Sequence, residues 1–191
     1  VQPDGKIVSV GASVDASAVE SRFALTRHNS DGTLDTGFGG DGTVTTAVNN
    51  MGPSLQWSEA HAVALQADGK IVVVGSSWRD YEDCCWFVVA RYNSDGTLDD
   101  SFSDDGRVFA DFDGPTEALD VAVDPGGRIV AAGYAGGRMA VLRLTGNGTP
   151  DPPFRGDSTG RPHPARPPLP ARRGRPAPPR ARPPPLPPAP T

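Results

Sequence analysis

The amino-acid sequence repeats itself over most of its length. The opening segment VQPDGKIVSVG has close copies in LQADGKIVVVG and VDPGGRIVAAG, and the three segments span 1–11, 65–75 and 123–133. A second block, which begins as FALTRHNSDGTLDTGF, follows each copy and spans 23–38, 87–102 and 139–154. The period is therefore 64 residues and then 58. A period of this length indicates supersecondary modules that complete their cores only against their neighbours.

Each unit contains four short β-strands by its residue pattern. In the complete unit, roughly 60–116, an Asp-Gly pair separates two apolar runs, which is a strong hairpin signal. We therefore predict two-residue turns between antiparallel strands at Asp4-Gly5, Asp68-Gly69 and Gly126-Gly127. The later strands are rich in β-branched and aromatic residues, and clusters of Gly, Asp and Pro divide them. No helical periodicity is present. The predicted strands lie near 6–11, 22–28, 43–48, 60–66, 70–76, 86–92, 107–112, 118–124, 128–134 and 138–144.

Four antiparallel strands per repeat are typical of a β-propeller blade. The middle strands are apolar on both faces, as in a blade that is covered on both sides. A β-sandwich or barrel also uses many short strands but would not repeat its sequence, and a β-solenoid repeats over shorter coils. The predicted fold class is therefore all-β: a partial β-propeller of four-stranded antiparallel blades in about three repeats, with a disordered tail rich in Pro and Arg.

The repeats divide the chain into four parts. Repeat 1 covers 1–64 and lacks its first strand, repeat 2 covers 65–122, and repeat 3 covers 123–160 and is truncated. The tail at 161–191 holds 14 of the 21 prolines and 7 arginines and no acidic residue, so it has no apolar run to bury. A closed propeller needs at least four blades. We therefore expect the chain to be a fragment of a longer array.

The origin of the tail leaves alternatives open. A frameshift in a GC-rich gene would produce this composition, and it is favoured because the third repeat breaks off where a fourth strand is expected. A genuine linker or stalk rich in Pro and Arg is the alternative. The tail also matches polyproline-ligand patterns, but a tract so rich in proline matches them by chance.

The repeats are acidic, whereas the tail is basic. All 23 acidic residues lie in 1–160 against 11 Lys and Arg, a net charge of −12, and the tail carries +7. An acidic repeat region argues against nucleic acid as a partner. No apolar run reaches membrane-spanning length, and no signal peptide precedes the repeats. Because the first residue lies inside a repeat, the missing signal peptide means little.

The motif QPDGKIV followed by FALTRHNSDGTLDTGFGGDG resembles the delta-60 repeat of large bacterial proteins, which are mainly secreted or attached to the cell surface. The resemblance covers 1–160 and is strongest in the first two repeats. It implies a propeller-like fold and an extracellular or cell-surface location. That family has no assigned catalytic activity, so the resemblance leaves function open.

The NSDGTLD turns are the best candidates for a metal site. They place oxygen ligands at alternate positions around a Gly, which loosely resembles the opening of a calcium loop. No Glu closes the loop, and the third repeat changes the pattern. A turn held by side-chain-to-backbone hydrogen bonds explains the same residues more simply, so no cofactor is predicted and calcium is the weaker interpretation. The weak calcium candidates are Asn29, Asp31, Asp35, Asn93, Asp95 and Asp99.

An Arg precedes an Asp by eight residues in every repeat. The Arg lies within an apolar strand, where an unpaired charge is costly, and the Asp opens a short turn whose carboxylate could accept it. Because the pair recurs in each unit, a structural clamp is favoured over an anion site. The predicted clamps are Arg27–Asp35, Arg91–Asp99 and Arg143–Asp151.

Residues with catalytic potential are few. The histidines at 28, 61 and 163 stand in no motif with a Ser or Cys nucleophile, so no catalytic residue is assigned. The adjacent Cys84 and Cys85 are read as two surface thiols, with a vicinal disulfide or metal site as the alternative. Trp57, Trp78 and Trp86 lie near variable connections, where a role in the core is favoured over stacking on a sugar.

These observations predict a non-enzymatic extracellular module for binding, adhesion or spacing. The variable segments 13–22 and 77–86 differ completely within a repeated framework, as binding loops would. The expected partners are an unknown protein or carbohydrate ligand and further repeats of the same parent protein. The alternative is the propeller part of a larger secreted enzyme, of the hydrolase or lyase class, whose active site lies elsewhere.

Overall fold

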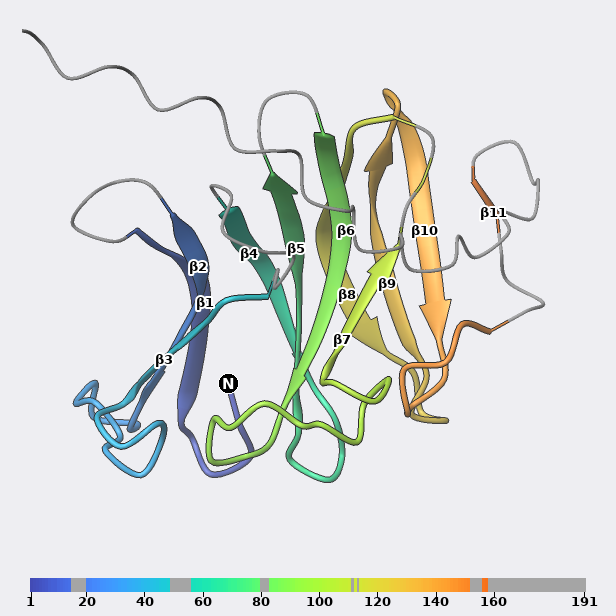
Figure 1. The fold of residues 1–191 in the computed structure, drawn as a ribbon. Helices are drawn as coiled ribbons and strands as arrows, with labels where there is room; N and C mark the ends of the chain where they lie inside the picture. Colours follow the sequence, from blue (N-terminus) through green and yellow to red (C-terminus); the bar gives the residue numbers. More distant parts are fainter. Residues whose placement is uncertain are drawn as a thin grey trace, which may run out of the picture.

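The computed structural model describes residues 1–14, 20–48, 56–79, 83–110, 112, 114–151 and 156–157. Their strands form three separate antiparallel sheets that lie side by side in chain order (Figure 1). The described residues contain strands, turns and bends and no helix. The all-β prediction is confirmed, and the ten predicted strands are all present with ends shifted by a few residues. The predicted tail at 161–191 lies outside the described residues.

Every sheet is a simple meander, in which each strand pairs with the next strand along the chain. The first sheet contains β1 (Ile7–Val14), β2 (Ser21–His28) and β3 (Thr43–Thr46). The second contains β4 (Gln56–Leu65), β5 (Ile71–Arg79), β6 (Asp83–Tyr92) and β7 (Arg107–Ala110). The third contains β8 (Thr116–Val123), β9 (Ile129–Ala135), β10 (Arg138–Leu144) and β11 (Gly156–Asp157).

The boundaries of the sheets differ from those of the sequence repeats. Strand β4 ends at Leu65, where the repeat numbering starts its second unit, yet β4 pairs with β5. The third repeat was expected to end at its third strand, but Val141 and Ala140 of β10 pair with Gly156 and Asp157. This two-residue strand occupies the fourth place in its sheet, so the expected order for that unit is corrected.

The turns at Asp68-Gly69 and Gly126-Gly127 join antiparallel strands as predicted, whereas the turn at Asp4-Gly5 leads into β1 with no described strand before it. The prediction of a two-residue loop is wrong. The Gln66 amide donates to the Lys70 carbonyl at 2.9 Å, and the Gly69 amide donates to the Gln66 carbonyl at 3.0 Å. The loop therefore has three residues, and only Gly69 has a positive φ, of 84°. A two-residue type I′ turn needs two positive φ values, whereas one Gly in the left-handed region fits a type I turn with a bulge. The other two hairpins have the same pair of hydrogen bonds.

A β-bulge explains the Gly that closes the DGKIV segment of the second sheet and the GGRIV segment of the third. The register of β4 against β5 shifts between Ala60 and Ala62, and this shift directs the Glu59 carbonyl at Gly75. A Cβ on Gly75 would lie 1.9 Å from that oxygen. Strand β8 repeats the arrangement, because a Cβ on Gly133 would lie 1.8 Å from the Glu117 carbonyl. Only Gly allows the first strand of the second and third sheets to approach this closely.

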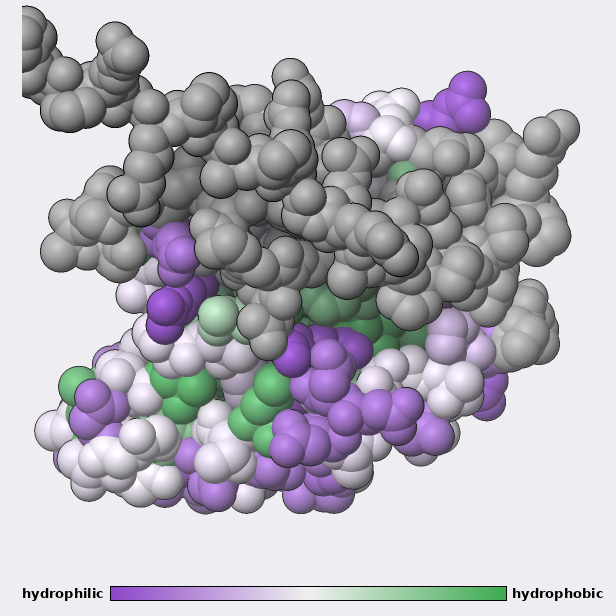
Figure 2. Space-filling view, in the orientation of Figure 1, coloured by the Kyte–Doolittle hydropathy of each residue, from purple (hydrophilic) through white to green (hydrophobic). Residues whose placement is uncertain are grey.

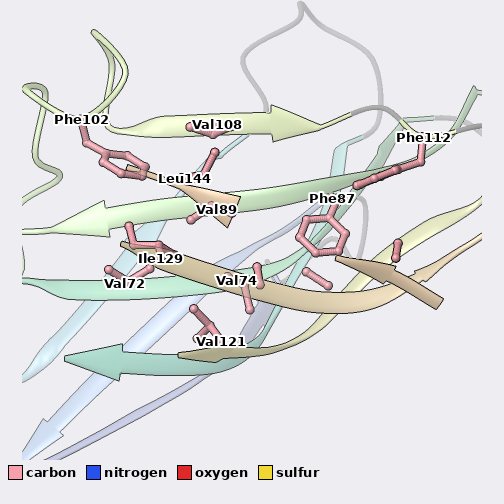
Figure 3. Close-up of a cluster of buried hydrophobic side chains, with 13 residues drawn as sticks. Val72, Val74, Phe87, Val89, Phe102, Val108, Phe112, Val121, Ile129 and Leu144 are labelled. Carbon is pink, nitrogen blue, oxygen red and sulfur yellow. The ribbon is translucent and has the colours of Figure 1, made fainter. Parts of the chain in front are cut away.

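The second sheet is buried on both faces. Along β5, Ile71 and Val73 belong to the cluster shared with the first sheet, while Val72 and Val74 belong to the cluster shared with the third. The alternation follows directly from the two-residue period of a strand. Figure 3 shows the cluster between the second and third sheets. In this cluster the ring centroids of Phe87 and Phe112 lie 5.5 Å apart in an edge-to-face contact. Most of the described surface visible in Figure 2 is hydrophilic or neutral, with hydrophobic residues in small patches.

Candidate functional site: a repeated joint between sheets

The three predicted Arg–Asp pairs are all ion pairs in the structure. The Arg Nε atom lies 2.6 Å from the Asp Oδ2 atom in Arg27–Asp35, 2.7 Å in Arg91–Asp99 and 2.8 Å in Arg143–Asp151. In each repeat the Asp amide also donates to the Arg carbonyl at 2.9 Å, which closes the turn that follows the strand. The Arg91 and Asp99 side chains are each 7 % exposed, whereas the Arg143 side chain is 22 % exposed.

A Lys from the hairpin completes the first two pairs. Lys6 Nζ lies 2.8 Å from Asp35 Oδ2, and Lys70 Nζ lies 2.8 Å from Asp99 Oδ2. The hydrogen bond from Lys6, with those from Gly37 and Arg27, lowers the pKa of Asp35 to about 2. Burial raises the pKa of Asp99, but Lys70, Ser101 and Arg91 outweigh it and hold the pKa below its usual range. The carboxylates of Asp35 and Asp99 are therefore charged at neutral pH, and each is paired with an Arg and a Lys of the same sheet.

These Lys contacts were not predicted from the sequence. The Lys of DGK recurs at a fixed place in the first two repeats, and this recurrence was the available signal. The hairpin and the turn are 29 residues apart, so no short motif links them. In the third repeat, Arg128 replaces the Lys and pairs instead with Asp124 of its own hairpin, at 3.4 Å.

The Arg also reaches the next sheet. Arg27 Nη1 donates to the carbonyl of Ser94, in the NSDG turn of the second sheet. Arg91 Nη1 donates to the carbonyl of Gly146, in the equivalent turn of the third sheet. One guanidinium thus joins its own turn to the turn of the following unit, because its Nε and Nη atoms point in different directions.

A Phe and a Gly pack beneath this hydrogen bond. The Arg27 guanidinium lies 4.6 Å from the centre of the Phe38 ring. On the next sheet, a Cβ on Gly96 would lie 2.9 Å from the edge of the same ring. Phe102 repeats both contacts, with Arg91 at 4.7 Å and a Cβ on Gly148 at 2.9 Å. The Gly of NSDG is therefore required for the approach of the two sheets as well as for its positive φ.

Backbone hydrogen bonds reinforce the same end of the joint. The Gly39 amide donates to the Asp95 carbonyl at 2.9 Å, and the Ser103 amide donates to the Asn147 carbonyl at 3.0 Å. These bonds again connect the turn of one sheet with the turn of the next. We call the set of Arg, Asp, Phe and facing turn the joint, and it occurs twice in the described residues.

At the opposite end of each interface, a side-chain hydroxyl donates a hydrogen bond to a backbone carbonyl of the preceding sheet. Ser58 Oγ, on β4, donates to the Ser21 carbonyl of the first sheet at 2.9 Å. Thr116 Oγ1, on β8, donates to the Cys85 carbonyl of the second sheet. Ser58 and Thr116 occupy the same place in successive units, as do Ser21 and Cys85. The two interfaces between sheets therefore have equivalent hydrogen bonds at both ends of the strands.

The calcium candidates form turns. Asp31 Oδ1 accepts the Thr33 amide at 3.0 Å and the Thr33 hydroxyl at 2.6 Å, and these hydrogen bonds lower the pKa of Asp31. Asn29 donates to Thr33 Oγ1 at 3.0 Å, and Asn93 and Asp95 make the same bonds to Thr97. Asp35 and Asp99 belong to the joint instead. In the part of the chain that the structure describes, no group of three His, Cys, Asp or Glu side chains could hold a metal ion.

His61 links two sheets through the bulge of β4. Its Nδ1 atom lies 2.9 Å from the Ala118 carbonyl of β8, and its Nε2 atom lies 3.3 Å from Glu117 Oε1. Glu59 Oε2 is 3.8 Å from the same nitrogen. The sequence placed His61 at the start of a strand and could not show that a bulge turns it towards the next sheet.

The tryptophans lie at the end of the second sheet remote from the joint. Trp57 and Trp78 are directly opposite each other on β4 and β5, and Trp86 pairs with Ser77. All three are half-buried, and Trp86 packs against the core cluster between the first two sheets. Cys85 is half-buried, and the side chain of Cys84 lies outside the described residues, so the bond state of this pair remains a prediction.

These features define a sector of a β-propeller, built from consecutive antiparallel blades with matching interfaces. A family model described as "Domain of unknown function (DUF5122) beta-propeller" matches residues 2–38, 66–102 and 125–154, more than half of the chain. The chain belongs to this family. Each matched segment ends at the Phe three residues after the joint Asp. A comparison with curated proteins gives no match.

Proposed function

We propose that the chain is a non-enzymatic extracellular module of delta-60-like repeats, which binds a protein or carbohydrate ligand through one end of its blades. The observation that carries this proposal is a division between the two ends. The hairpins and the NSDG turns, with all their repeated polar contacts, lie at one end of the sheets. The C-terminal ends of β1 and β5 and the N-terminal ends of β2 and β6, which carry the described residues of the variable segments 13–22 and 77–86, lie at the other end.

The repeated ion pairs and the residues proposed to bind a ligand therefore lie at opposite ends of the sheets. At the repeated end, the Arg, Asp and Lys side chains are used in contacts between or within blades. At the variable end, sequence can change while the strands and interfaces stay the same, which is the usual position of binding residues on a rigid scaffold. The half-buried Trp57 and Trp78 lie there, and amphipathic aromatic side chains are enriched in binding surfaces.

A loop exchange tests the proposal. Residues 79–84 are replaced by the sequence of residues 15–20, which has the same length and comes from the equivalent connection of the first sheet, so Trp78 and the core residue Trp86 are kept. Binding of the native and exchanged proteins is measured on immobilised cellulose, chitin, collagen and fibrinogen. We expect the native protein to bind one of these probes, and the exchanged protein to lose that binding while keeping its melting temperature within a few degrees.

A matched control changes the repeated end instead. Arg128→Met removes an exposed charge from a hairpin, and binding should be retained. Binding that survives the loop exchange but is lost in Arg128→Met would place the ligand at the repeated end and contradict the proposal.

Within the described residues, no helix has the length and apolar character needed to cross a membrane.

A further inference from the structure

Two tryptophans at the variable end of the second sheet lie outside the hydrophobic core. Trp57 of β4 and Trp78 of β5 are directly opposite each other, so their Cβ atoms lie about 4.5–5.5 Å apart on one face of the sheet. Each is half-buried, and neither packs against a core cluster, whereas Trp86 on the other face does. The pair therefore forms an aromatic surface that the core does not use.

The fold does not require aromatic residues at these two positions. By the repeat alignment the third sheet has Pro115 and Gly136 there, and the Gly136 amide donates to the Pro115 carbonyl at 2.9 Å. The first sheet has Val14 in place of Trp78, and Val14 is 52 % exposed. Because the other two sheets form without these rings, the Trp pair is a feature of one blade and not of the repeat.

The Trp pair faces the third sheet. Ser58, which lies between Trp57 and Glu59 on β4, donates to a carbonyl of the first sheet at 2.9 Å, so by strand alternation both neighbours point the other way. The third sheet ends at the same level with a β9–β10 turn that consists of Gly136 and Gly137. This turn has no side chains that could cover the rings.

Two carboxylates lie on the same side of the second sheet. Glu59 is two residues from Trp57, and its side chain is 52 % exposed. Glu59 Oε2 lies 3.8 Å from His61 Nε2, and Glu117 Oε1 lies 3.3 Å from the same nitrogen. Glu117 also accepts the Tyr134 hydroxyl. Among the described side chains, no Lys or Arg forms an ion pair with either Glu.

The imidazole between these carboxylates adds a further acceptor. His61 Nδ1 faces the Ala118 carbonyl at 2.9 Å, so Nδ1 carries the hydrogen of the neutral ring and Nε2 has a lone pair. Nε2 and both carboxylates therefore present acceptors to one another. A cation placed beside them would be attracted by all three groups.

From the aromatic pair and these acceptors we infer that the site binds an Arg or Lys side chain of a basic protein segment. A cation is attracted by the face of an indole ring as well as by carboxylates. The repeats carry a net charge of −12, which draws basic partners towards them. A neutral carbohydrate would stack on the rings but would not be attracted by this charge. The inference rests on the proposed function, since it assigns a ligand to the variable end.

Titration with a synthetic peptide of alternating Gly and Arg tests the inference. The matched probe is the same peptide with citrulline in place of Arg, because citrulline keeps the shape of Arg and lacks its charge. We expect the Arg peptide to bind in calorimetry and to change the tryptophan fluorescence, with an affinity that falls as salt is added. The citrulline peptide should bind about tenfold more weakly or less.

Three variants locate the site. Trp57→Leu and Trp78→Leu each remove one aromatic face, and Glu59→Gln removes an exposed carboxylate but keeps its shape. Each should weaken binding of the Arg peptide by about fivefold or more. The control is Glu20→Gln, because Glu20 lies at the same end of the first sheet, is 41 % exposed and changes the net charge equally. Circular dichroism melts confirm that each variant is folded, and Glu59→Gln tests the site without any change in the rings.

Several outcomes would overturn the inference. They are absence of binding at millimolar Arg peptide, equal binding of the citrulline peptide, and binding that Trp57→Leu and Glu59→Gln both leave unchanged. Binding of cellohexaose in place of the Arg peptide, dependent on Trp57 and insensitive to salt, would show a carbohydrate site instead. A probe that the loop exchange releases and Trp57→Leu does not would contradict this inference and leave the proposed function intact. Binding that is kept in both would contradict both.

Discussion

Replacement of Arg91 by Met should destabilise the protein far more than loss of a surface charge would. Arg91 makes the 2.7 Å ion pair with Asp99, donates to the Gly146 carbonyl of the next sheet and to Ser101 at 3.2 Å, and packs on Phe102. Met keeps much of the side-chain length but none of the donors. The buried Asp99 carboxylate then keeps only Lys70 as a charged partner.

The magnitude follows from burial. Breaking a buried ion pair by removing one partner costs about 3–5 kcal/mol. For a chain of this size, each kcal/mol corresponds to about 2–4 °C in melting temperature, so Arg91→Met should lower it by about 6–20 °C. The matched control is Arg128→Met, whose ion pair with Asp124 has side chains 48 % and 33 % exposed. An exposed pair contributes less than about 1 kcal/mol, so the control should change stability little.

A double-mutant cycle with Asp99→Asn isolates the pair. Thermal and urea unfolding of the two single variants and the double variant should give a coupling free energy of about 0.5–3 kcal/mol. Additive losses would show that the two side chains do not stabilise each other. An Arg91→Met protein as stable as Arg128→Met would refute the structural role of the joint altogether.

Three further predictions concern the strands, pH and metal. Gly75→Ala should cost about 1–3 kcal/mol or more in unfolding free energy, because its Cβ meets the Glu59 carbonyl, whereas Gly11→Ala has nothing within 4 Å and should be neutral or slightly stabilising; equal melting temperatures would contradict the bulge. The folded-state pKa of Asp35 is lowered to about 2, so its contribution to stability is complete above the unfolded pKa near 4 and is lost as pH falls towards 2; a melting temperature that stays constant from pH 5 to pH 2 would contradict this assignment. Calcium should change the melting temperature little, since Asp31 and Asp95 are used in turns; a rise of many degrees that Asp31→Asn with Asp95→Asn abolishes would show structural calcium sites.

The sequence predicted what local patterns determine. Apolar runs bounded by turn residues placed all ten expected strands, and the constant spacing of eight identified the Arg–Asp pairs, because both signals lie within one repeat. The contacts of Lys70 and Arg91 with distant turns could not be read in the same way, since they depend on how strands 29 and 55 residues apart meet. The hairpin loop was predicted one residue too short because Asp-Gly is compatible with both turn types, and the register decides between them.

The measurement that most directly tests the central account is hydrogen–deuterium exchange of the native, Arg91→Met and Arg128→Met proteins. If the joint couples the blades, Arg91→Met should accelerate exchange in β5 and β6 and also in β8 and β9 of the next sheet, while Arg128→Met leaves these strands protected. Faster exchange confined to the turn between β6 and β7 would contradict the account, because it would mean that each blade is stable without the contacts of its neighbour.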